Sequence, residues 1–273
     1  VGQPYDRSVL DQALKDLTEG LRLDSDNAGA LSARGMIYAL KGEADRAIRD
    51  LDQAIRRSPS MEAFLARGYA HAAKGQHDRA IQDFDEVIRR SPSAEALHIR
   101  GFSYAARGQH DRAIQDYDEA IRLNASYWVA FGARAISYAA MGQHQRAILD
   151  FDQVIRLQPD DPSGWNNRCW SRAILGQLDL ALEDCEQALR LRPDYAQAFD
   201  SRGLVHLKAN RLDAAIADYD ASLRLDSNNA YSLYGRGIAR SRKGDQSGGD
   251  ADLAAARVIK TDIAEVMARR GVR

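Results

Sequence analysis

The sequence predicts an all-α fold, an open solenoid built from paired antiparallel helices. A motif that recurs every 33 or 34 residues, apolar positions at helical spacing and turn residues between the helical stretches together indicate this class. GQHDRAIQD occurs at 75–83 and again at 108–116, and the near copy GQHQRAILD follows at 142–150. A period of this length is typical of supersecondary units that bury their apolar faces by stacking on one another. We therefore expect the motif to belong to the scaffold and not to a repeated chemical site.

The first helix of each unit is expected to carry a small residue. This series is Gly35, Gly68, Gly101, Ala135, Cys169, Gly203 and Gly237. The second helix brings another small residue and, four places beyond it, a larger group that recurs as Leu51, Phe84, Tyr117, Phe151, Cys185, Tyr219 and Leu253. Spacings of three and four place these residues on one helical stripe. The small residues let the two helices approach closely, and the larger group fills the space beside them.

Turn residues separate the predicted helices. The turn inside each unit lies near Gly42, Gly75, Gly108, Gly142, Gly176, Asn210 and Gly244. These residue types tolerate the left-handed backbone that ends a helix. A second break follows the second helix and carries Pro59, Pro92, Pro159 and Pro193. RRSPS at 56–60 and 89–93 resembles a kinase target, but we interpret it as the loop between units, with Ser capping the next helix.

The order of a small residue, Tyr three places later, Ala, a large apolar residue, Ala and Pro resembles the tetratricopeptide repeat. Tyr38, Tyr104 and Tyr138 hold the Tyr place. The resemblance covers nearly the whole chain and implies one domain, 1–273, with seven full repeats, half a repeat at each end and sixteen helices. The expected boundaries are a half repeat at 6–27, full repeats at 28–60, 61–93, 94–127, 128–161, 162–195, 196–229 and 230–263, and a C-terminal half repeat at 264–273. The resemblance also implies a right-handed superhelical α-solenoid whose first helices line a concave groove.

Composition argues against several function classes. Lys and Arg number 38 against 39 Asp and Glu, a net charge of −1, which does not suit a nucleic-acid binder. No apolar run approaches the length of a membrane span. VGQPYDRSVL lacks an initiator Met and a signal core, which indicates a trimmed or processed chain. We expect a soluble protein, in the cytoplasm or as a mature exported chain.

Charged residues recur in matched numbers. Arg precedes the small residue in every unit: Arg34, Arg67, Arg100, Arg134, Arg168, Arg202 and Arg236, with Arg270 in the last half unit. Asp follows the Ala of the second helix three places later: Asp16, Asp50, Asp83, Asp116, Asp150, Asp184, Asp218 and Asp252. Pairing each Asp with the Arg of the next unit leaves none over and predicts a ladder of inter-repeat ion pairs. The alternative is a charged stripe that binds a ligand.

Cysteines and histidines offer few candidates for chemistry. Cys169 and Cys185 fall at buried interface places, and we expect two free thiols, with a disulfide as the alternative. His77, His110 and His144 recur one repeat apart, too far to share a metal ion, and are expected to be solvated. No nucleophile–base set, phosphate-binding loop or metal cluster occurs, so we predict no catalysis, no metal and no cofactor.

The family resemblance implies a partner-binding groove along the first helices. By register, its candidate residues are Leu65, Tyr69, His98, Phe102, Ile136, Asn166, Trp170, Leu204 and Tyr234. Large apolar groups over small Ala neighbours suit an amphipathic helix or an extended apolar peptide. The alternative is that these residues only pack against the next helix. Family members that bind chaperone tails use Lys and Asn at these places, and that clamp is absent here.

These observations favour a non-enzymatic protein–protein interaction scaffold. One alternative is a regulatory or substrate-recruiting domain of a larger enzyme, since both ends of the chain fall within a repeat. Another is a self-assembling scaffold, a homo-oligomer formed by stacking of the terminal helices.

Overall fold

The computed structural model describes residues 7–272, and within this range the chain forms sixteen α-helices. Their bounds are α1 Arg7–Leu23, α2 Ala28–Leu40, α3 Ala44–Arg57, α4 Met61–Ala73, α5 His77–Arg90, α6 Ala94–Ala106, α7 His110–Leu123, α8 Trp128–Ala140, α9 His144–Leu157, α10 Pro162–Ile174, α11 Leu178–Leu191, α12 Ala196–Lys208, α13 Leu212–Leu225, α14 Ala230–Arg242, α15 Gln246–Ile259 and α16 Ile263–Arg269. From α2 to α15, helices of 13 and 14 residues alternate, one pair per repeat. The all-α repeat solenoid is thereby confirmed.

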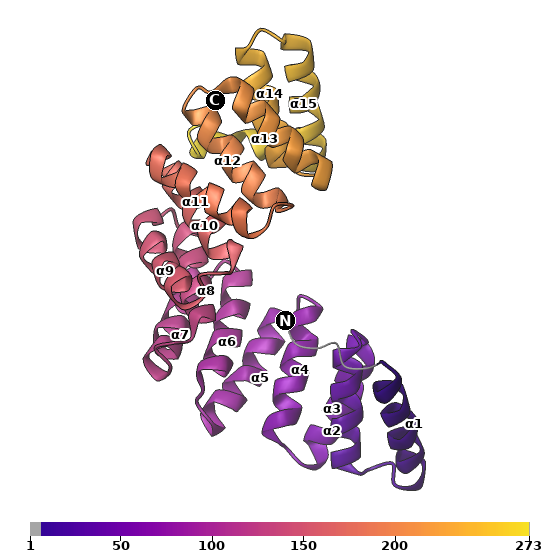
Figure 1. The fold of residues 1–273 in the computed structure, drawn as a ribbon. Helices are drawn as coiled ribbons and strands as arrows, with labels where there is room; N and C mark the ends of the chain where they lie inside the picture. Colours follow the sequence, from indigo (N-terminus) through magenta and orange to yellow (C-terminus); the bar gives the residue numbers. More distant parts are fainter. Residues whose placement is uncertain (1–6, 273) are drawn as a thin grey trace. The chain divides into compact units, whose positions relative to one another are not determined.

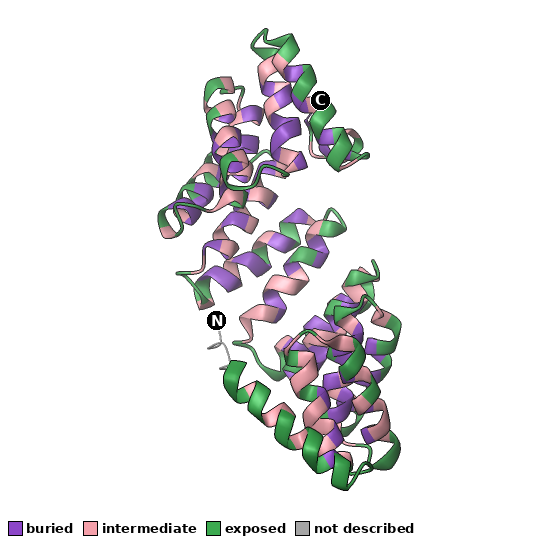
Figure 2. Ribbon diagram, turned by 90° about the vertical axis from the view of Figure 1, so that its right-hand side faces the viewer, coloured by how far each residue is buried: buried purple, intermediate pink, exposed green. Residues whose placement is uncertain are grey.

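Two compact units make up the chain, unit 1 at 1–133 and unit 2 at 134–273. Within each unit, consecutive hairpins pack side by side (Figure 1). Buried residues lie on the sides of the helices that face their neighbours, whereas α1 is exposed along most of its length (Figure 2). The expectation of a single domain stays a prediction.

Close approach within each hairpin depends on the small residue of its first helix. A Cβ atom added at Gly101 would lie 2.6 Å from the Tyr117 ring, and one at Gly68 would lie 2.5 Å from Phe84. Because real Cβ atoms do not come so close, a larger residue would push the two helices apart. The large group of the second helix therefore packs directly on the small residue of the first.

The turns inside the hairpins confirm the predicted glycines. A positive φ occurs at each of them: Gly42, Gly75, Gly108, Gly142, Gly176 and Gly244, and also Asn210 at 55°. The loops between repeats also agree, since Ser60 and Ser93 accept hydrogen bonds from backbone N–H groups three residues later, at 3.1 Å. These serines cap α4 and α6, which supports the structural interpretation of RRSPS.

The expectation of two free thiols is wrong, because Cys169 and Cys185 form a disulfide. Cys169 takes the small place and Cys185 the large place of the same hairpin, and their Cα atoms lie 5.5 Å apart. In other hairpins the same close approach of the two helices lets an aromatic ring pack on a glycine. The Cα–Cα distance that results from it is the distance that a disulfide needs. Both side chains are fully buried.

The predicted ladder exists, but its pairing was wrong. Each Arg pairs with the series Asp of its own repeat: Arg34–Asp50, Arg67–Asp83, Arg100–Asp116, Arg134–Asp150, Arg168–Asp184, Arg202–Asp218 and Arg236–Asp252. The link to the preceding repeat comes from a different Asp, two places further along the second helix, in Arg67–Asp52, Arg100–Asp85, Arg168–Asp152 and Arg236–Asp220. Side chains two places apart point roughly 200° apart around a helix, so the two aspartates face different neighbours.

Candidate partner-binding grooves

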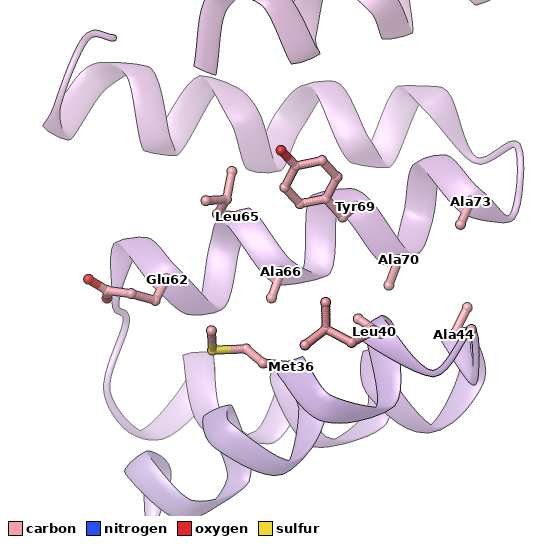
Figure 3. Close-up of a pocket in the computed structure, with 11 residues that line it drawn as sticks. Met36, Leu40, Ala44, Glu62, Leu65, Ala66, Tyr69, Ala70 and Ala73 are labelled. Carbon is pink, nitrogen blue, oxygen red and sulfur yellow. The ribbon is translucent and has the colours of Figure 1, made fainter. Parts of the chain in front are cut away.

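Unit 1 carries an open apolar groove between α2 and α4. Its cavity measures about 640 Å³ and is lined by Met36, Ala39, Leu40, Gly42, Ala44, Glu62, Leu65, Ala66, Tyr69, Ala70 and Ala73. Met36 and Leu40 point from α2 towards Ala66 and Ala70 of α4 (Figure 3). Leu65 and Tyr69 leave α4 on its other side, away from α2. We call this surface the unit 1 groove.

The predicted site residues of unit 1 remain accessible. Tyr69 is 47% exposed and packs edge-to-face on Phe84, with ring centroids 5.9 Å apart. Phe102 is 55% exposed. His98 is partly buried near the rings of Tyr117 and Tyr127, and burial lowers its pKa. These aromatic groups present apolar surface that no residue of their own unit covers fully.

In unit 2 the predicted site residues divide into open and covered positions. Ile136 is 56% exposed, whereas Leu204 is 4% and Tyr234 7% exposed. Asn166 is also buried, and its side-chain oxygen has no hydrogen-bond partner in the described chain. Trp170 packs against a hydrophobic cluster that includes Leu204 and Tyr234. That cluster also contains Met267 and Val272, so residues after α15 cover this face.

The residues after α15 depart from the register of an eighth repeat. Gly271 follows Arg270, so the Arg series would place it at the small residue inside a first helix. It instead has a φ of 77° and follows the end of α16. The Val272 N–H bonds to the Met267 carbonyl at 3.0 Å, the contact that closes a helix ending in glycine. Arg270 therefore does not continue the Arg series, and its guanidinium lies over the Trp170 ring instead.

The expectation that the helix-start histidines are solvated is wrong at His144, and the Nδ1 atoms of His77 and His110 are also buried. His144 is buried, 8% exposed, with its ring 5.4 Å from that of Trp170. Burial and the nearby Arg270 and Lys208 charges lower its pKa. Trp occurs at this groove place in one repeat only, so the repeat pattern of the sequence could not indicate the contact between His144 and Trp170.

The repeat register did not predict several residues that line the unit 1 groove. Ala66, Ala70 and Ala73 line the unit 1 groove at spacings of four and three, a helical stripe that could have been read from the sequence. Glu62 places one carboxylate at an end of the groove (Figure 3).

Among the described residues, no three His, Cys, Asp or Glu side chains are placed to hold a metal ion. Within the same range, no helix has both the length and the apolar character that a membrane span requires.

Comparison with known families identifies the repeat. A family model described as Tetratricopeptide repeat matches residues 5–62, 41–95, 65–127, 100–162 and 132–196. A second, described as TPR repeat, matches residues 203–244. No curated protein sequence matches the chain.

Solved structures share the fold at low identity. A chain of the APC/C hetero-tetramer Cut9–Hcn1 has 19% identity and a TM-score of 0.70, with 96% of this chain and 52% of that chain covered. A tetratricopeptide repeat protein from Parabacteroides merdae has 16% identity and a TM-score of 0.75, covering 89% and 98%. YrrB, described as a TPR protein with an unusual peptide-binding site, has 20% identity and a TM-score of 0.50, covering 69% and 97%. This chain thus spans about half the length of the Cut9–Hcn1 chain, and these likenesses concern the fold.

Proposed function

Because this chain belongs to the tetratricopeptide repeat family, we propose that it is a non-enzymatic scaffold that binds a peptide or helix of a partner protein in the unit 1 groove. The observation that carries the proposal is the apolar cavity of about 640 Å³ between α2 and α4. A volume of this size accepts several side chains of a partner segment. The peptide-binding site described for YrrB, which shares the fold, supports the same kind of role here.

The side chains around the groove determine which partner fits. Met36, Leu40 and Tyr69 are 40%, 59% and 47% exposed, although they are large and apolar. Covering such surface is favourable by roughly 25 cal/mol per Å² of apolar area. The alanines of α4 leave room between these groups, so a partner would insert apolar side chains there. Glu62 would attract a basic residue at one end of the segment.

The test is to select peptides from a display library on the full chain and to measure their affinity by fluorescence anisotropy. Tyr69→Ala should weaken the selected peptides roughly 10- to 30-fold, because partly buried aromatic groups are typical binding hot spots. Glu62→Gln should weaken only the peptides that carry a basic residue. Both variants should melt close to the unchanged chain.

Leu123→Ala is the matched control. Leu123 lies in the same unit, is 43% exposed and does not line the groove. Its replacement should leave every affinity unchanged. Peptides that bind Tyr69→Ala as tightly as the unchanged chain would place the binding surface elsewhere.

A further inference from the structure

The residues after α15 occupy the groove places of unit 2. We call them segment 263–272: the seven-residue helix α16, followed by Arg270, Gly271 and Val272. Ile263, Met267 and Val272 are 0%, 2% and 1% exposed. All three belong to the hydrophobic cluster that contains Leu204 and Tyr234. The segment therefore inserts its apolar side chains where a partner of this face would place its own.

Arg270 is held by two aromatic rings from different helices. Its guanidinium lies 5.0 Å from the Trp170 ring centroid on α10 and 4.3 Å from that of Tyr231 on α14. A cation between two ring faces is attracted by both of them. The Asp200 carboxylate on α12 is close enough for the Arg270 charge to act on it. Three consecutive first helices thus contribute to one arginine site.

Lys208 ties the backbone of the segment to the same face. Its Nζ donates to the Arg270 carbonyl at 3.2 Å and to the carbonyls of Ala173 and Ile174 at 2.8 and 3.2 Å. The last two groups lie at the C-terminal end of α10. A single ammonium group therefore joins α10, α12 and the segment, as a groove lysine would hold the backbone of a bound peptide.

In unit 1 no described part of the chain covers the same groove places fully. The place directly after the small residue is held by Tyr69 and Phe102 in unit 1, which are 47% and 55% exposed. In unit 2 it is held by Ile136, which is 56% exposed, and by Leu204, which belongs to the cluster with segment 263–272 and is 4% exposed. The register is the same, so the difference in exposure reflects what covers the residue. At Leu204 the chain itself supplies the cover, through segment 263–272.

We propose that segment 263–272 is a built-in ligand that blocks the groove of unit 2, and that a partner segment of the same pattern binds there once it is displaced. The pattern is that of Ile263, Met267, Arg270 and Val272. It consists of two apolar residues one helical turn apart, an arginine three places later and an apolar residue two places after the arginine. A seven-residue helix is too short to persist alone in water, so the segment folds only where it docks. The short connection from α15 keeps it near the groove and gives it an advantage over a free peptide.

The probe is a fluorescein-labelled peptide of residues 261–272, TDIAEVMARRGV, measured by anisotropy against the 273-residue chain and its variants. The unchanged chain should bind it weakly. Met267→Asp should release the segment, because it buries a charge, and should bind the peptide at least tenfold more tightly. A peptide with Ala in place of Arg270 should lose most of that affinity.

Arg270→Ala is a second, milder variant that keeps the apolar side chains of the segment. It should bind the peptide at least threefold more tightly than the unchanged chain. If neither variant binds the peptide better, the segment is a permanent part of the core and the proposal fails. Concentration-dependent dimerisation of the unchanged chain through exchange of this segment would also overturn it. Tyr69→Ala should leave peptide binding unaltered, which separates this result from the fate of the unit 1 groove.

Discussion

Replacing Arg100 by Ala should destabilise the chain far more than the loss of a surface ion pair. Arg100 donates to both carboxylate oxygens of Asp116, at 2.9 and 2.6 Å, and Asp116 is only 6% exposed. Removing the guanidinium leaves a buried carboxylate without these donors. Breaking a buried pair costs about 3–5 kcal/mol, and the partial exposure of Arg100 reduces this to about 2–4 kcal/mol.

The loss should depend on pH in a defined direction. Burial raises the pKa of Asp116, and the Arg100 contact opposes that rise. Without Arg100 the folded-state pKa rises further above its unfolded value, so the folded chain favours the protonated carboxyl. Stability is then retained below about pH 4 and lost as the pH rises through the folded-state pKa. The cost of the substitution should be large at pH 8 and small at pH 4.

Urea unfolding followed by circular dichroism at both pH values measures the effect, and hydrogen exchange of α6 and α7 locates it. Arg122→Ala is the control, because the Arg122 and Glu119 side chains are 69% and 42% exposed. The control should change the free energy of unfolding by less than about 1 kcal/mol. If Arg100→Ala lowers the free energy of unfolding no more than Arg122→Ala does, the interpretation of a buried ion pair is refuted.

Two further predictions concern unit 2. Cys169→Ser with Cys185→Ser should lower the free energy of unfolding by about 3 kcal/mol, for a disulfide that closes a sequence separation of 16 residues. Cys169→Gly with Cys185→Tyr, which copies the Gly101–Tyr117 pair, should recover part of the loss in thermal melts. Burial raises the pKa of Asp200 from 3.8 to about 6, so ionisation of this carboxyl costs stability as the pH rises through 6. Asp200→Asn should therefore stabilise the chain by about 1–3 kcal/mol at pH 8 and have no effect at pH 4 in urea titrations; equal effects at both values would contradict this.

The repeated features of the fold could be predicted from the sequence because each appears in many copies. The left-handed turn at Gly75 and the contact of Gly101 with Tyr117 follow from spacing alone. A helical period, a turn residue and a small residue are local properties of the sequence. A single occurrence of any of them is ambiguous, but several copies at the same spacing are not. The alternatives of an enzyme-linked domain and of self-assembly depend on sequence and partners outside the chain, and they stay predictions.

Features that depend on direction around a helix could not be predicted from spacing. Asp83 and Asp85 are two places apart, and only the geometry of the hairpin shows that Asp83 faces Arg67 while Asp85 faces Arg100. Counting equal numbers of Arg and Asp favours pairing with the next repeat, which leaves none over, but the count carries no information on direction around the helix. Gly271 is similarly ambiguous, since glycine suits both a close helix contact and a helix end.

The positions that break the repeat are the ones that build the arginine site of unit 2. Lys208 stands where other repeats carry Ala, Leu, Ile or Arg. Asp200 and Trp170 occupy places where no other repeat has the same residue. All three lie at segment 263–272, through a carbonyl contact, a charge interaction and a cation–π contact. A repeated residue serves every hairpin equally and so cannot mark one place along the groove. Specificity along a solenoid must therefore come from residues that occur once. Exchanging Lys208 for Ala, as at Ala73, should weaken the hold on the segment and, because the same ammonium group bonds to the Ala173 and Ile174 carbonyls, should also loosen the contact of α12 with α10.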